Sequence, residues 1–199
     1  MLRKERVQLP ANLALHKGIV FKAVLAFIVS YMLFLMLWIQ IKDYYGRGVT
    51  FTASKLAAGI KDVKFEEMTA ERDVTQATFS PLGSGSNILI DIPVKTSSYA
   101  FNAPLTFAIM AVMYQFIRRR KRAYGEALLI LLSVHLLYVV SLEAKVLTDM
   151  LVDRGLEKTS IPRIFFYQFL WSFTDNMIIR FEPFLIGFYM FIRFKKQVS

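Results

Sequence analysis

The sequence contains no cysteine and only two histidines, His16 and His135. Without cysteine the chain has no disulfide framework, no thiolate nucleophile and no cysteine-based metal site. Two histidines are too few for a dedicated histidine-rich metal centre. We therefore predict neither a metal nor another cofactor.

Common catalytic motifs are also missing. The sequence contains no GxxxxGK[ST] phosphate loop, no HExxH and no GxSxG. No pair of carboxylates adjoins a histidine in the sequence. Because active sites assemble in space, a membrane enzyme stays an alternative, but we expect a non-catalytic protein.

The net charge of +10 raises the question of nucleic-acid binding. The basic clusters, however, adjoin long apolar runs, and membrane topology and attraction to anionic lipid headgroups account for such charge. We therefore expect membrane lipids as partners and no nucleic acid.

Positive charge is sorted along the chain. Thirteen Lys and Arg residues gather near the start, at 118–122 and near the end, whereas residues 42–103 carry seven basic and seven acidic residues. Lys and Arg near membrane ends stay cytoplasmic. This predicts a multi-pass protein of the bacterial inner membrane with both termini cytoplasmic. The residues expected to determine this topology are Arg118, Arg119, Arg120, Lys121 and Arg122; an anionic lipid site there is the alternative.

The predicted fold is an α-helical membrane protein with four transmembrane helices, a small extracytoplasmic α+β module between helices 1 and 2, and a long hairpin of helices 3 and 4. The predicted segments are a basic N-terminus at 1–22, the first span at 23–45, the module at 46–100, the second span and basic loop at 101–122, the third helix at 123–155, a turn at 156–162, and the fourth helix and tail at 163–199. Trp38, Tyr44 and Tyr45 are expected at the outer interface.

Within the module, residues 50–60 predict a short helix, and three stretches of alternating residues predict half-buried strands. The strands lie around Val63 and Phe65, from Val74 to Phe79, and from Ile88 to Ile92. A module of this size is marginal alone, so we expect it to rest on the helices or on another protein.

Asn102 and Pro104 predict a helix start, and Gly155 predicts a helix end. The aromatic residues between Phe165 and Phe173 predict an interfacial belt with a packing face, with a lipid-binding surface as the alternative.

The last helix carries Asp175, Arg180 and Glu182 among apolar residues. Charged groups inside a bilayer are costly and usually face a partner or a cavity, although neutralisation by the protein's own helices is the alternative. Pro183 cannot donate to the carbonyl of Ile179, which predicts a kink and a free oxygen there. Asp175 is expected near the outer boundary, and the other two near the middle of the bilayer.

Counting the helical rise from Gly125 and from Arg193 places His135 about 15 Å and Glu182 about 16 Å from the cytoplasmic end. We therefore predict that His135 and Glu182 face each other, while Arg180 points to a different helix or to a partner. The alternative is that His135 is a core histidine or faces lipid or a neighbouring apolar face, so that the match in depth is accidental.

The four-span layout, the module after the first span, and the run from Arg180 to Gly187 (RFEPFLIG) resemble the small membrane proteins that accompany exosortases, in particular the exosortase H-associated type. Exosortases are bacterial membrane proteases or transpeptidases that use a catalytic cysteine. The resemblance implies that this chain is the companion of such an enzyme and carries no catalytic residue.

Together these features predict a non-catalytic accessory subunit of an inner-membrane protein-processing assembly, with an exosortase-like enzyme as its partner. The polar contacts expected to serve that partner or the membrane interior are His135, Asp175, Arg180 and Glu182. A component of a transport or lipid-handling complex is the alternative.

Overall fold

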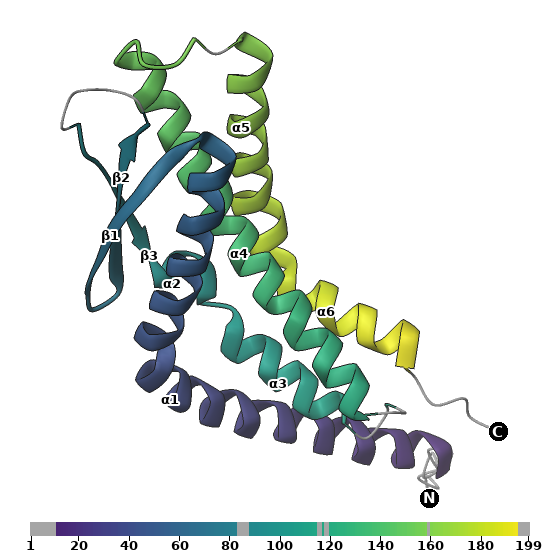
Figure 1. Ribbon diagram of the computed structural model, residues 1–199. Coiled ribbons are helices and arrows are strands. Elements are labelled where there is room, and N and C mark those ends of the chain that lie inside the picture. The colour runs from purple at the N-terminus through teal and green to yellow at the C-terminus, as the bar shows by residue number, and fades with distance from the viewer. Residues whose placement is uncertain (1–10, 83–87, 115–116, 118–119, 159, 195–199) are drawn as a thin grey trace, which may run out of the picture.

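The computed structural model describes residues 11–82, 88–114, 117, 120–158 and 160–194. Within these ranges the chain forms four helical rods and one small sheet (Figure 1). The elements are α1 (Ala11–Lys61), β1 (Val63–Glu71), β2 (Val74–Pro81), β3 (Ile90–Lys95), α2 (Thr96–Ala100), α3 (Ala103–Met113), α4 (Arg120–Asp153), α5 (Ile161–Phe173), the π-helical turn η1 (Thr174–Ile178) and α6 (Ile179–Phe194).

The first rod is one helix of 51 residues, so the predicted span at 23–45 and the predicted helix at 50–60 are continuous. Figure 1 shows α1 changing direction, with its N-terminal part along α3 and its C-terminal part beside the sheet. The boundary predicted at Gly46 between the first span and the module is therefore absent, because α1 continues through it. Gly46 instead allows a close approach of α2, because a Cβ there would lie 1.9 Å from Oγ1 of Thr96.

The sheet is antiparallel with the order β1-β2-β3, so the three predicted strands are present, although the third begins at Ile90 and not at Ile88. Alternate side chains of β2 and β3 are buried, among them Phe79 and its register partner Ile90. They pack against Leu147 and Leu151 of α4 and Ala58 of α1. The sheet therefore rests on the helices, as its small size predicts.

Asp73, in the turn between β1 and β2, ties the sheet to two helices. Its carboxylate accepts hydrogen bonds from the backbone N–H and hydroxyl of Ser97 in α2, and it forms a 3.2 Å ion pair with Lys42 of α1. Burial raises the pKa of Asp73, but these hydrogen bonds and the charge of Lys42 outweigh that effect, so its pKa lies below the ordinary value.

The fourth rod consists of α5, η1 and α6 and runs antiparallel to α4. Gly155, at φ +68°, ends α4: its N–H donates to Val152, and the N–H of Leu156 donates to Leu151. This is the Schellman pattern that a glycine after a helix predicts. Between α5 and α6 the rod changes direction at η1 (Figure 1), a short distance before Pro183.

Two helices are long and apolar enough to cross a membrane, namely α1 over 20–61 and α4 over 121–153. Beside them, α3 has 11 residues and α6 has 16. At the usual rise they measure about 16 Å and 24 Å, whereas a hydrocarbon core is about 30 Å thick.

One end of the molecule gathers the N-terminal ends of α1 and α4 and the C-terminal ends of α3 and α6 (Figure 1). A core cluster joins Met110 of α3, Ala127 of α4 and Met190 of α6 there. The sheet and α5 lie toward the other end.

Candidate functional site

Each of the four rods contributes one side chain to a polar cluster in the middle of the molecule, which we call the central polar cluster. Tyr45 comes from α1, Thr106 from α3, His135 from α4 and Glu182 from α6. The Tyr45 hydroxyl lies 2.6 Å from His135 Nδ1, and His135 Nε2 lies 2.9 Å from Glu182 Oε2. Thr106 Oγ1 donates to Glu182 Oε1 at 3.0 Å. The cluster therefore connects all four rods.

The predicted pairing of His135 with Glu182 is confirmed by these distances. Both side chains are fully buried. One proton arrangement satisfies every contact: Tyr45 donates to Nδ1, and Nε2 of a neutral imidazole donates to Glu182. Burial of a carboxylate without hydrogen-bond donors has a high free-energy cost, so these contacts stabilise the packing of the rods.

Pro183 leaves the carbonyl oxygen of Ile179 without its helical donor, as predicted from the sequence. The structure supplies a substitute, because Nδ2 of Asn102 donates to this oxygen at 2.7 Å. Asn102 precedes α3 but makes no side-chain cap on that helix. Its amide therefore holds the start of α3 to the start of α6 instead.

Aromatic rings close the cluster. The rings of Tyr45 and Tyr99 lie 5.6 Å and 5.4 Å from the imidazole of His135, centroid to centroid. Among the described residues, no three His, Cys, Asp or Glu side chains are placed to hold a metal ion. His135 and Glu182 are fully buried in this cluster, and Tyr45 is half-buried.

Arg180 does not join the central polar cluster. Its side chain is exposed, and the structure places it beside Asp175 of η1 in a recess of about 320 Å³ that Ser98, Phe101 and Ile179 complete. We call this the Arg180 recess. Within the described ranges Arg180 makes no ion pair. Arg180 therefore lies outside the contact between His135 and Glu182, and the prediction that it points to a different helix or to a partner stays a prediction.

A second buried polar contact joins α1 to α4 and escaped the sequence reasoning. Ser54 donates to Oε1 of Glu143 at 2.6 Å, and Oε2 of the fully buried Glu143 has no hydrogen-bond partner among the described residues. The sequence reasoning also missed Tyr45 as a contact of His135, Thr106 as a contact of Glu182, and Asn102 as the donor to Ile179. The contact of Glu143 could have been expected from its position, because it follows His135 by about two helical turns and so lies on the same face of α4.

Among the residues predicted to determine topology, the described ones lie at the gathered end of the rods, where α4 begins. Arg118 and Arg119 are outside the described residues, and Arg120 begins α4. Lys121 and Arg122 are exposed, and Arg122 pairs with Glu126 at 2.8 Å. Arg193 at the end of α6 pairs with the same carboxylate at 3.3 Å.

Helix α5 contains no buried residue. Phe165, Phe169 and Phe173 follow one another at intervals of four, and their rings stack with centroids 6.5 Å and 5.9 Å apart. We call these three residues the aromatic ladder. They are 67%, 57% and 44% exposed, which leaves an apolar face on the half of the molecule that carries the sheet.

Comparison with protein-family models, with curated proteins and with solved structures finds no match for this chain. What the protein does is therefore inferred from its own residues.

Proposed function

We propose that this chain is a non-catalytic accessory subunit of an exosortase-type protein-processing assembly in a bacterial inner membrane. It holds or positions the partner enzyme or that enzyme's substrate. The resemblance in the last helix supports this proposal, and so does the central polar cluster, whose members hydrogen-bond to one another.

In the proposed placement, α1, α3, α4 and α6 lie in the bilayer and the gathered end faces the cytoplasm. The lengths of α1 and α4 support this placement, and so do Lys121, Arg122 and Arg193 at the gathered end. The short helices α3 and α6 are accommodated if the bilayer is locally thinner around them. The sheet and α5 are then extracytoplasmic.

The observation that carries the proposal is the exposure of α5. In the half of the molecule that contains the sheet and α5, the sheet carries exposed charged residues such as Glu71 and Arg72, which are favourably solvated by water. Exposure of the aromatic ladder to water is unfavourable, and exposed apolar patches of this kind usually mark protein contacts. Aromatic side chains are also enriched at the centres of protein interfaces. We therefore assign the aromatic ladder to the partner.

The test is copurification of the full chain with the exosortase-like enzyme in a mild detergent. Substituting the three phenylalanines of the aromatic ladder with alanine removes no buried contact of this chain, so it should still insert. Loss of interface anchors typically costs about 2 kcal/mol each, so binding should fall at least about 100-fold.

A matched control is the pair Leu129→Ala and Leu132→Ala, which trims exposed apolar side chains on α4. It should leave the partner bound. If the ladder variant inserts and copurifies as well as the unchanged chain, the assignment of α5 to the partner is wrong. If no enzyme of this type copurifies with the unchanged chain, the accessory-subunit proposal itself fails.

A further inference from the structure

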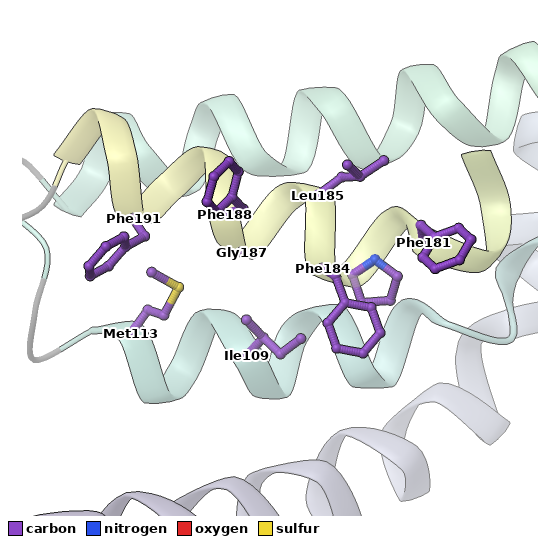
Figure 2. A pocket seen from close by; sticks show the side chains of 9 residues that line it. Ile109, Met113, Phe181, Phe184, Leu185, Gly187, Phe188 and Phe191 are labelled. Carbon is purple, nitrogen blue, oxygen red and sulfur yellow. The ribbon is translucent and has the colours of Figure 1, made fainter. Parts of the chain in front are cut away.

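The two halves of the molecule present different surfaces. Between α3 and α6 lies a groove of about 630 Å³ that is lined by apolar residues, among them Ile109, Phe184 and Phe188 (Figure 2). In the proposed placement this groove lies in the bilayer, where lipid acyl chains are as apolar as its lining, so lipid alone is a suitable cover. The other half contains the sheet, and a strand at the edge of a sheet has unpaired backbone N–H and C=O groups.

The edge strands of this sheet are β1 and β3, and the edge of β3 is blocked. Pro93 lies within β3, opposite Gln76 of β2. Proline has no N–H, and within a sheet it occupies an edge strand with its nitrogen facing away from the neighbouring strand. Helix α4 also packs against β3. A further strand therefore cannot pair regularly with β3.

The register of β1 and β2 shows which backbone groups of β1 face outward. Residues 72–73 form the turn between the two strands, and the carbonyl before such a turn accepts a hydrogen bond from the N–H after it, so Glu71 and Val74 are a hydrogen-bonded pair. Hydrogen-bonded and non-hydrogen-bonded pairs alternate along an antiparallel ladder. The N–H and C=O groups of Met68 and Ala70 therefore point away from β2.

The position of Pro93 supports this assignment independently. Gln76 of the central strand lies opposite Thr69 of β1 on one side and opposite Pro93 on the other. A residue in a central antiparallel strand directs both backbone groups to one neighbour, and Pro93 has no N–H to exchange. Gln76 therefore bonds to Thr69. Met68 and Ala70, one position to either side of Thr69, are left open to the outside.

The regular part of this open edge runs from Glu67 to Glu71, because the register shifts between Phe65 and Glu67. We call the run from Glu67 to Glu71 the β1 edge. Among the described residues no strand pairs with it. Its side chains alternate between an exposed outer face and a half-buried face toward the helices, with Glu67, Thr69 and Glu71 on the first and Met68 and Ala70 on the second.

The outer face of the β1 edge is acidic. Glu67 and Glu71 form no ion pair within the described part of the chain, whereas Glu66 pairs with Lys64 at 2.7 Å. Opposite charges directly across two strands attract each other, and like charges repel. Two copies of this chain that joined their β1 edges would bring these carboxylates together, so a second copy is disfavoured. A strand with Lys or Arg at alternate positions is favoured.

The helix-facing side of the β1 edge continues into apolar side chains. Phe65 lies on the same side of β1 as Met68, and its ring contacts that of Phe51 of α1, with centroids 5.9 Å apart. Phe51 is 41% exposed. Apolar side chains on the other face of an added strand would cover this surface.

We propose that the β1 edge binds an extended segment of another protein, which adds to the sheet as a fourth, antiparallel strand. The segment pairs its backbone with Met68 and Ala70, directs basic side chains toward Glu67 and Glu71, and lays apolar side chains over the helix-facing side. In this mode of recognition the main-chain hydrogen bonds provide affinity and the alternate side chains provide specificity. Antiparallel pairing is chosen because it is the more stable kind. The proposal depends neither on the aromatic ladder nor on the identity of the partner enzyme.

The test uses the full chain in a mild detergent and fluorescent synthetic peptides that alternate Lys and Val, with binding followed by fluorescence anisotropy. One peptide is N-methylated on every Lys and the other on every Val, so each has N–H groups along one edge only. In an antiparallel strand whose Lys side chains lie on the outer face, the Val N–H groups face β1. The Lys-methylated peptide should therefore bind, and the Val-methylated peptide should bind at least about tenfold more weakly.

Variants of the chain test the same contacts from the other side. Met68→Pro removes an outward N–H and no hydrogen bond of the ladder between β1 and β2, so the sheet should stay folded while peptide binding falls about tenfold. Met68→Leu keeps the N–H and is the matched control. Glu67→Lys combined with Glu71→Lys should also weaken binding about tenfold, because attraction becomes repulsion. Asp153→Lys, at the exposed end of α4, should leave binding unchanged.

Four results would overturn the proposal. Equal binding of the two methylated peptides would show attraction by charge alone, and binding of neither would show a closed edge. A folded Met68→Pro variant that binds as tightly as Met68→Leu would move the contact elsewhere. A dimer of the unchanged chain that Met68→Pro dissociates would show that the β1 edge takes a second copy. If Met68→Pro misfolds, the two methylated peptides decide by themselves, and copurification of the partner enzyme bears only on the proposed function.

Discussion

The central polar cluster predicts strong coupling between His135 and Glu182. His135→Phe keeps a ring of similar shape but leaves Oε2 of Glu182 and the hydroxyl of Tyr45 without their partner. Breaking a buried pair by removing one member costs about 3–5 kcal/mol. Glu182→Met, which keeps the length of the side chain, should cost a similar amount because it leaves Nε2 of His135 and the hydroxyl of Thr106 without their acceptor.

The double variant should be less destabilised than the sum of the single variants. Both partners are then apolar, and replacing both members of a buried polar pair by groups of the same shape is nearly neutral for that contact. What remains is the loss of partners for Tyr45, which is only partly buried, and for Thr106, whose hydroxyl can turn to its own helix. We expect a coupling free energy of about 2 kcal/mol or more.

The assay is reversible unfolding in mixed detergent micelles, followed by tryptophan fluorescence. Trp38 and Trp171 suit this measurement because both lie in or against the core that packs around the cluster. Each single variant should lower the unfolding midpoint, by roughly 10 °C in a thermal version of the experiment. Ser133→Ala, on the exposed face of the same helix, should change stability by less than about 0.5 kcal/mol. Additivity of the two variants to within about 0.5 kcal/mol would refute the coupling.

Two other predictions concern the contacts between α1, α2 and the sheet. Gly46→Ala should destabilise the half of the molecule that carries the sheet by about 1–3 kcal/mol, because its Cβ would overlap Thr96. Faster proteolysis of the sheet would report this, whereas unchanged proteolysis would contradict it. Asp73→Asn should lower stability at neutral pH. Because the folded pKa of Asp73 lies below the unfolded value, its contribution is present above about pH 3.9 and is lost as the pH falls through the folded pKa. The difference in unfolding midpoint between variant and unchanged chain should therefore shrink in acid, and a constant difference from pH 7 to pH 3 would show that Asp73 acts in another way.

The sequence alone determined those structural elements that depend on residues close together in the chain. Alternation of apolar and polar side chains predicted the three strands, because successive side chains of a strand point to opposite faces. Gly155 predicted the end of α4, because glycine readily adopts the left-handed backbone conformation that ends a helix. The pairing of His135 with Glu182 was also within reach. Helical rise is constant, so counting from two basic ends places both residues at one depth.

Tertiary structure decided what depends on contacts between distant segments. The sequence predicted that the module begins at residue 46, but α1 continues through this position, where it packs against α2, α3 and α4. The change of direction in α1 turns Tyr45 toward His135, whereas the sequence suggested an interfacial ring. Asn102 donates a hydrogen bond to Ile179 of α6, and Glu143 accepts one from Ser54 of α1. In each pair the two residues are more than 70 positions apart in the chain. No local pattern specifies such partners, because they are chosen by how the helices pack.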